Sequence, residues 1–243
     1  MKKAYTLPIL FGFALTSYTH GSTITVAEWN FNNFTQEELD GNDYAGLGEE
    51  IDADVGAGLF TITEGPSGGT NFRRSSGGGT EVNRSDNTED DGGMIFFRRG
   101  QRWHDGEFEY RVDTTGFTDL NFSFAMDMDS TAPEWVTVSW KIGESGTLNT
   151  LDTIENPVDG EGDQVGFDWT AFSYDLSGET AVNDQSDLRF HFQFASDGAG
   201  STTSDGTRMD NVLITAIPEP STYAALFGLF ALGMIVWRRR KRS

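Results

Sequence analysis

The stretch LRFHFQF, residues 188–194, alternates apolar and polar side chains without a break. Successive residues of a β-strand point to opposite faces, so the stretch predicts a strand with four apolar side chains on one face and three polar ones on the other. The stretch NFSFAMDM, residues 121–128, repeats this pattern. Residues 134–142 alternate too, which places Trp140 on the apolar side of a third strand and Trp135 on its polar side.

Weaker alternation predicts further strands, and no segment of the middle of the chain has a helical period beyond a single turn at 36–39. The expected weaker strands are 24–31, 58–63, 93–98, 107–113, 147–154, 169–175 and 208–215. Glycine- and aspartate-rich turns separate them. About ten short strands predict an all-β, jelly-roll-like antiparallel β-sandwich over residues 22–217. The polar segment 64–92 is expected to be a long loop or a weak internal boundary.

The charge distribution restricts the partners of this domain. The 243-residue chain has a net charge of −21, and residues 22–217 contain 37 acidic but only ten basic side chains. Such a surface argues against nucleic-acid binding, which requires basic groups for the phosphates, and favours cations or neutral polymers as partners. The absence of cysteine excludes thiol catalysis and cysteine-ligated zinc.

The N-terminal end has the pattern of an export signal. Lys2 and Lys3 precede a short apolar run, and small or polar residues follow up to Gly21. This order predicts a secretory signal peptide over residues 1–21. Cleavage after Ala27 and retention as an uncleaved anchor are the alternatives.

The C-terminal end, residues 218–243, consists of three parts in a fixed order. Pro218, Glu219 and Pro220 come first, an apolar run expected to be a helix follows at 223–237, and a basic cluster ends the chain. The basic cluster is Arg238, Arg239, Arg240, Lys241 and Arg242. Basic charges directly after an apolar run retain the tail on the cytoplasmic side, so residues 22–217 are expected outside.

This three-part tail resembles the PEP-CTERM sorting signal of Gram-negative bacteria. The resemblance implies that an exosortase, a membrane cysteine transpeptidase, recognises Pro218, Glu219 and Pro220 and removes the tail. It also implies an inner-membrane-anchored precursor, a final place at the cell surface or outside the cell, and a producer of exopolysaccharide or biofilm. A permanent one-pass anchor is the alternative.

Two short segments resemble secreted bacterial jelly-roll modules. Residues 206–215 are similar to their closing strand, in which an Asp-Asn pair such as Asp210-Asn211 comes first, and Trp29-Asn30-Phe31 is similar to their opening strand. By this resemblance Asp210 would be a ligand of a structural calcium ion. Calcium prefers carboxylate and carbonyl oxygens, so Asp127, Asp129 and the loop 159–163 are further candidates. Asp210 could instead bond backbone amides of its turn.

No motif identifies catalytic residues. His104 and His191 stand in no metal or triad spacing and are interpreted as surface or sheet residues. A glycoside hydrolase needs two facing carboxylates, and the sequence neither selects nor excludes such a pair.

Exposed tryptophans can stack on sugar rings, and Trp103 and Trp135 are the candidates. We therefore expect an exported, non-catalytic surface or matrix protein that binds polysaccharide. A secreted glycan hydrolase or lyase and a purely structural matrix protein are the alternatives.

Overall fold

The structure is a computed structural model that describes residues 22–32, 50–64, 72–76, 79–83, 93–97, 106–130, 132–195 and 206–219. These residues form thirteen strands and one short 3₁₀ turn, η3 (Thr180–Val182). The strands are β1 (Ile24–Trp29), β2 (Glu50–Asp52), β3 (Val55–Gly56), β4 (Gly58–Glu64), β5 (Phe72–Ser76), β6 (Gly93–Phe97), β7 (Glu107–Val112), β8 (Phe117–Met128), β9 (Trp135–Ile142), β10 (Asn149–Glu155), β11 (Phe167–Asp175), β12 (Leu188–Ala195) and β13 (Thr207–Pro218).

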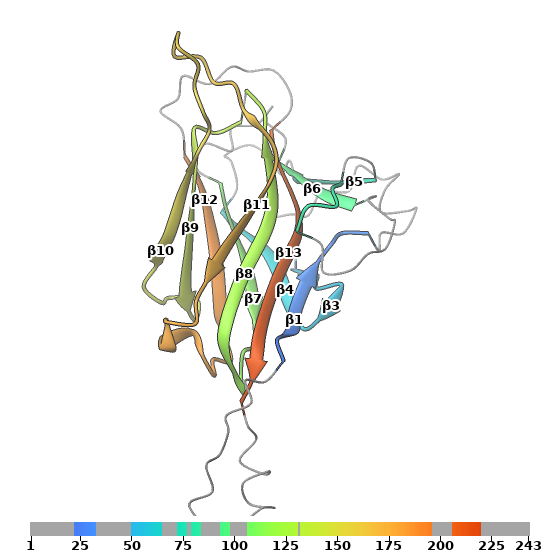
Figure 1. The fold of residues 1–243 in the computed structure, drawn as a ribbon, viewed down its shortest axis with the longest axis vertical. Helices are drawn as coiled ribbons and strands as arrows, with labels where there is room; N and C mark the ends of the chain where they lie inside the picture. The colour runs from blue at the N-terminus through green and yellow to red at the C-terminus, as the bar shows by residue number, and fades with distance from the viewer. Residues whose placement is uncertain are drawn as a thin grey trace, which may run out of the picture.

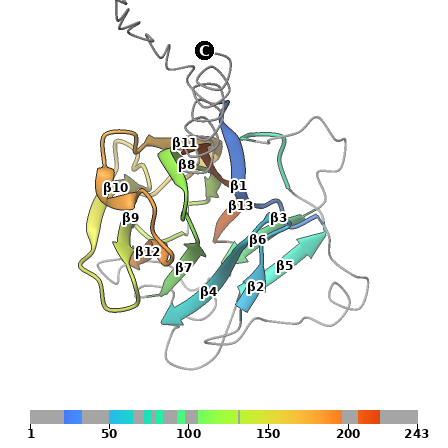
Figure 2. The same cartoon turned by 90° about the horizontal axis from the view of Figure 1, so that it is seen from below.

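The strands form two antiparallel sheets that pack face to face as a β-sandwich (Figures 1 and 2). Sheet A has the order β11-β8-β13-β1-β3, with β6 and β5 also beside β13, and sheet B has the order β10-β9-β12-β7-β4-β2. From β7 onward the chain passes repeatedly between the sheets, and only β9 and β10 are consecutive neighbours within one sheet. This confirms the expected all-β sandwich.

The three strictly alternating stretches are the best-predicted elements. They correspond to β12, β8 and β9, and each begins or ends within four residues of its expected bounds. The weaker strands are also present, and their ends differ from the expected bounds by at most three residues. The loop expected over 64–92 is partly wrong, because residues 72–76 form β5 and pair with β6.

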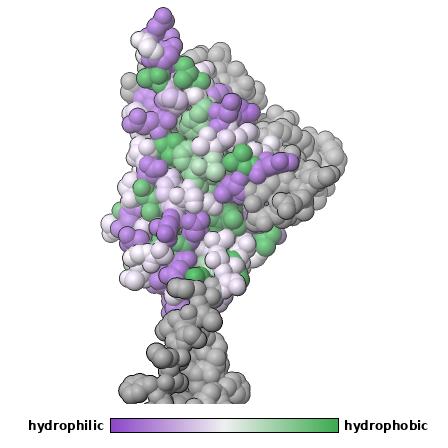
Figure 3. Space-filling view, in the orientation of Figure 1, coloured by the Kyte–Doolittle hydropathy of each residue, from purple (hydrophilic) through white to green (hydrophobic). Residues whose placement is uncertain are grey.

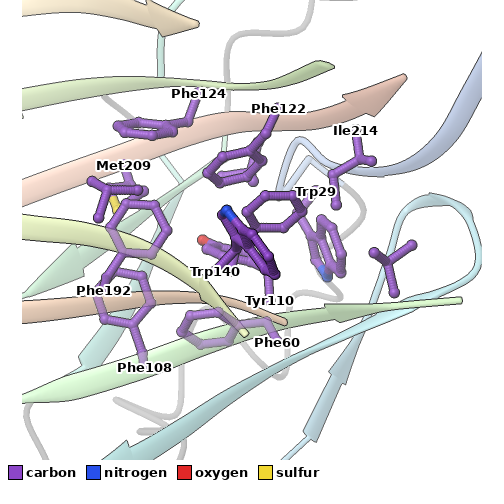
Figure 4. Close-up of a cluster of buried hydrophobic side chains, with 14 of the residues drawn as sticks. Trp29, Phe60, Phe108, Tyr110, Phe122, Phe124, Trp140, Phe192, Met209 and Ile214 are labelled. Atoms are coloured by element: carbon purple, nitrogen blue, oxygen red, sulfur yellow. The ribbon is translucent and has the colours of Figure 1, made fainter. Parts of the chain in front are cut away.

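The largest fully buried side chains of the core are aromatic, and they come from both sheets (Figure 4). Phe122 of sheet A stacks on Phe190 of sheet B with ring centroids 3.9 Å apart, and Phe108 stacks on Phe192 at 4.7 Å. Trp29 meets Tyr110 edge to face at 4.9 Å. The Phe122–Phe190 and Trp29–Tyr110 contacts cross between the sheets and set the separation of the two layers, whereas Phe108 and Phe192 are neighbours within sheet B.

β13 has two different partners along one of its edges. Residues 207–209 pair with β6, residues 212–216 pair with β1, and Asp210 and Asn211 lie in the interval between them. The segment 79–83 is bonded there: Asp210 Oδ2 accepts a hydrogen bond from the Thr80 amide, and Asn211 Nδ2 donates to the carbonyl oxygens of Thr80 and Val82. Asn211 has a positive φ of 49°, a conformation that asparagine tolerates better than most residues.

The side of sheet A that faces the viewer in Figure 3 mixes hydrophilic and hydrophobic residues over its coloured part.

The start of the first strand lies beside the end of the last strand, because Ile24 at the start of β1 pairs with Ala216 near the end of β13. Among the described residues no helix is long and apolar enough to cross a membrane. The expected signal peptide, the single turn at 36–39 and the apolar run 223–237 lie outside the described residues.

Candidate functional site

The outer face of sheet B is the part of the described structure where polar and charged side chains are most closely organised. β7, β9 and β12 turn their apolar side chains inward, so the alternate residues lie on the opposite face. We call this set the outer face of sheet B. It comprises Glu107, Glu109 and Arg111 of β7, Trp135, Thr137, Ser139 and Lys141 of β9, and Arg189, His191 and Gln193 of β12.

Strand register arranges these side chains in rows across the sheet. Arg189 of β12 is directly opposite Lys141 on one side and Arg111 on the other. Three cations in one row would repel one another, because like charges directly opposite in neighbouring strands are destabilising. Anionic side chains between them are therefore required.

Glu109 and Asp187 provide those anions. The Glu109 carboxylate, with a side chain only 4% exposed, pairs with Lys141 Nζ and lies 3.1 Å from Arg189 Nη1. Asp187 lies 3.0 Å from Arg189 Nε and 2.9 Å from Arg111 Nε. Two carboxylates thus hold three cations in place.

The proton affinities reflect this pairing. The hydrogen bond to Asp187, supported by Glu109, raises the pKa of the Arg189 guanidinium against the effect of burial. Partial burial acts to raise the pKa of the Asp187 carboxyl, but the hydrogen bonds and charges of Arg189 and Arg111 outweigh it and lower that pKa.

A second polar group lies in the neighbouring rows. Glu107 Oε2 is 3.0 Å from His191 Nε2, and Glu107 Oε1 accepts a hydrogen bond of 2.8 Å from Gln193 Nε2. His191 was expected on the polar face as a surface or sheet residue. It lies on that face, but it is only 3% exposed because it is packed between the flanking strands.

Trp135, one of the two predicted glycan-binding residues, begins β9 at one corner of this face. It is partly buried and lies opposite Ala195 of β12 and Glu155 of β10. Trp103, the other candidate, lies outside the described residues, as does His104. Trp140 points into the core, as the alternation predicts.

The predicted calcium ligands lie elsewhere, on and after strands of sheet A. Asp210 is buried, and its carboxylate accepts hydrogen bonds from the backbone amides of Asn211 at 2.7 Å and Thr80 at 2.9 Å. Asp127 is buried too and lies 2.7 Å from Arg208 Nε. Asp129 follows β8 directly. In the part of the chain that is described, no three acidic or histidine side chains are close enough together to hold a metal ion.

The loop 159–163 uses its first carboxylate to order its own backbone. Asp159 Oδ1 accepts hydrogen bonds from the amides of Glu161 at 2.9 Å and Asp163 at 3.0 Å. These bonds lower the pKa of Asp159, because they favour the ionised form. The arrangement is a self-contained turn, and calcium binding there stays a prediction.

The calcium hypothesis makes opposite predictions for Asp127→Asn with and without the ion. Burial, which the Arg208 pair offsets only in part, raises the pKa of Asp127 above its ordinary value. Because the pKa of Asp127 is higher in the folded state than in the unfolded state, its protonated form favours folding. This contribution is fully present below the unfolded-state pKa and is lost as the pH rises through the folded-state pKa. In chelator at pH 7 we therefore expect Asp127→Asn to raise the melting temperature of residues 22–219 slightly, with no difference at low pH.

In saturating calcium the same substitution is expected to lower the melting temperature, because it removes a ligand. The unaltered domain should lose several degrees when chelator is added, since a ligand bound only to the folded state stabilises it. Glu144→Gln, at an exposed position after β9 and outside every candidate calcium site, serves as the control. Coincident melting curves of the unaltered domain in calcium and in chelator would exclude a structural calcium ion.

Sequence reasoning did not find the ion pairs of the outer face of sheet B. They join residues that are far apart in the chain, such as Glu109 and Arg189, and depend on the register of three strands. It also did not find Tyr110, whose buried hydroxyl hydrogen-bonds to none of the described residues. Burial, together with the negative charge of Asp210, raises the pKa of Tyr110 well above its ordinary value.

Comparison with protein families matches residues 216–242 to the PEP-CTERM protein-sorting motif. The chain therefore carries this sorting motif, as its three-part tail indicated. No curated protein matches the chain.

Several solved β-sandwich structures resemble the fold at low identity. The K1 cleaved adhesin domain of Lys-gingipain from Porphyromonas gingivalis W83 is 13% identical with a TM-score of 0.38, and the match covers 82% of this chain and 99% of that one. The K2 domain of the same protein is 13% identical with a TM-score of 0.41, covering 80% and 97%. A structure described as "CBM4 structure and function" is 16% identical with a TM-score of 0.35, covering 65% and 86%. Similarity at this level carries no inference about what this chain binds.

Proposed function

We propose that this chain is a non-catalytic, exported surface or matrix protein of a Gram-negative bacterium that binds polysaccharide through the outer face of sheet B. Its precursor is anchored in the inner membrane by residues 223–237 until an exosortase-type transpeptidase removes the tail. The mature domain then resides at the cell surface or in the exopolysaccharide matrix. The sorting motif supports export, and the arrangement around Trp135 supports binding.

The observation that carries the binding proposal is the combination of Trp135 with fixed polar groups on one face. A sugar ring can place its apolar side on an indole while its hydroxyl groups bond to neighbouring amides and hydroxyls. Thr137 and Gln193 are opposite each other in the row next to Trp135, and Gln193 is already oriented by its bond to Glu107. Side chains that are ordered before binding lose less conformational entropy when the ligand arrives.

Overall charge narrows the ligand class. With 37 acidic and ten basic side chains in residues 22–217, the domain repels a polyanion at long range. A neutral polysaccharide, or an anionic one bridged by divalent cations, is therefore the ligand that we propose.

A glycan hydrolase is the second candidate, because Glu107 and Glu109 lie two residues apart on the outer face of sheet B. Alternate residues of a strand are about 7 Å apart, within the separation of roughly 5–10 Å that glycosidase carboxylates use. However, Glu109 is buried and held by two cations, so it has neither the access nor the freedom to transfer a proton to a substrate. This arrangement favours the non-catalytic role.

Purified residues 22–219 would be tested on a panel of bacterial and algal polysaccharides, with calcium and with chelator, by recording retention on the polymer and release of reducing sugar. We expect retention without release. Trp135→Ala should weaken retention roughly tenfold or more, as loss of a central aromatic contact does. Trp169→Ala, at a partly buried tryptophan of β11 in sheet A, is the matched control and should leave retention unchanged.

Release of reducing sugar that Glu107→Gln abolishes would favour the hydrolase instead. Absence of both retention and release would leave the purely structural matrix protein. Equal loss of retention in both tryptophan variants would contradict the placement of the site on sheet B.

A further inference from the structure

The sorting motif begins inside the folded sheet. The matched segment starts at residue 216, whereas β13 continues to Pro218. We propose that the fold shelters the backbone of the motif, and that the last residues of β13 must leave the sheet before the tail can be removed. This inference rests on the sorting motif and is independent of polysaccharide binding.

Specific contacts hold the beginning of the motif. Ile217 pairs with Thr118 and Pro218 pairs with Phe117 across the β8–β13 ladder. The Glu219 amide donates a hydrogen bond of 2.8 Å to the Gly116 carbonyl oxygen. Pro218 and Glu219 are thus held to the sandwich through their backbones, although both residues are exposed.

The acceptor of that bond is itself fixed. Gly116 has a φ of +80°, which a residue with a side chain rarely adopts, and its amide donates to Asp184 Oδ1 at 2.9 Å. The Asp184 amide in turn donates to the Phe117 carbonyl oxygen at 3.2 Å. The turn that receives Glu219 is therefore itself hydrogen-bonded to the segment around Asp184.

Covalent geometry limits the space available to an enzyme. Four residues lead from Glu219 to Tyr223, where the apolar run begins, and at full extension they span at most about 14 Å. An enzyme in the membrane must hold an extended peptide within that interval while the whole sandwich is attached to one end of it. Releasing residues 217–219 would free Pro218 and Glu219 themselves for the enzyme, which a longer chain beyond Thr222 does not do, and would add roughly another 10 Å of chain.

The end of β13 is also the part of the strand that opens most easily. β1 begins at Ile24 opposite Ala216, so from Ile217 onward β13 is paired with β8 alone. The register is irregular between Thr215 and Ile217, and Pro218 has no amide hydrogen to donate. Local opening with few contacts to break occurs without global unfolding. Each hydrogen bond lost reduces the open population about fivefold, so a small open fraction is present at equilibrium.

Removal of the tail then proceeds only from the open state. One peptide bond of the sorting segment is broken, and its carbonyl carbon becomes bonded to the nucleophile of the enzyme. The nitrogen of that bond takes up a proton, so the tail leaves as an amine. The acyl group finally passes to water or to another nucleophile, which regenerates the enzyme. The fold limits the rate through the fraction of chains in which residues 217–219 are free.

The test uses the full chain, produced in a Gram-negative host that contains an exosortase-type enzyme, with tail removal followed by pulse-chase labelling. Insertion of Gly-Ser-Gly-Ser between Ile217 and Pro218 moves the motif out of the sheet. We expect tail removal to become at least fivefold faster. The same insertion between Thr222 and Tyr223 lengthens the chain equally but leaves the bond of Glu219 intact, and it should change the rate less than twofold.

Equal acceleration by both insertions would mean that only reach limits the reaction, and it would overturn the proposal. Absence of acceleration, or absence of tail removal in the unaltered chain, would overturn it as well. Hydrogen exchange of the Glu219 amide is a measurement that does not depend on the insertions. We expect the Glu219 amide to exchange more slowly than in an unstructured peptide, and to exchange through local opening of the end of β13. Exchange as fast as in an unstructured peptide would contradict sheltering.

Discussion

Phe122→Ala is expected to destabilise the sandwich by about 3–5 kcal/mol, because it removes a fully buried aromatic ring and leaves a cavity between the sheets. Phe122 stacks on Phe190 at a centroid distance of 3.9 Å and also meets Phe124 and Phe192 within 6.0 Å. No rearrangement of a single strand can fill the space, since the lost contacts come from both layers (Figure 4).

Thermal and urea unfolding of residues 22–219 would measure this effect. These residues contain every strand of the described structure and its whole core. For a domain of this size the loss corresponds to a fall in melting temperature of about 6 °C or more. Leu148→Ala, at a side chain that is 46% exposed, is the control and should change stability by less than about 0.5 kcal/mol. A loss below 1 kcal/mol for Phe122→Ala would contradict the packing of the two sheets.

The same alternation that buries Phe122 explains why much of the fold was predictable from the sequence. Where one face of a strand is buried, a shift by one residue would expose every apolar side chain, so the pattern fixes the strand and its inward face. β8, β9 and β12 follow this rule, and the outward placement of Trp135 opposite the inward Trp140 follows from it as well.

The elements that sequence reasoning missed lack such a pattern. β2 and β3 have three and two residues, too few for a period to be recognised. β5 has the sequence FRRSS, whose composition does not favour a strand, and its extended form depends on pairing with β6.

The site was predictable only where it depends on one strand. Trp135 follows from the alternation of β9 alone, whereas the contacts of Asp210 join residues 130 positions apart. Glu109 and Arg189 are 80 positions apart, and their pairing requires β7 and β12 to be neighbours in one particular register. No pattern within a single strand encodes that register.

The ion pairs on the outer face of sheet B lead to the second large effect. Glu109→Gln preserves the size of the side chain but removes the charge that compensates Lys141 and Arg189, whose side chains are 13% and 15% exposed. Removing one partner of a buried ion pair typically destabilises a protein by about 3–5 kcal/mol, because a charge is left buried without compensation. Arg189 retains Asp187, so we expect a loss of about 2–4 kcal/mol in urea unfolding of residues 22–219. Glu144→Gln, at an exposed position after β9, should change stability by less than about 0.5 kcal/mol.

A double-mutant cycle with Lys141→Met distinguishes an electrostatic cause from a packing defect. If Glu109→Gln destabilises because Lys141 is left uncompensated, removal of that cation should recover part of the loss, and the two substitutions should couple by about 1 kcal/mol or more. Additive effects would mean that Glu109 acts through packing, since a lost volume is not restored by changing the charge of its neighbour. The cycle also tests the binding face itself, because the row of Arg111, Arg189 and Lys141 is next to the His191 row, and like charges opposite one another in neighbouring strands repel. Two results together would mean that charge balance in this row maintains the surface on which Trp135 lies. The two substitutions would couple in stability, and polysaccharide retention would be weaker in Glu109→Gln but not in the double variant.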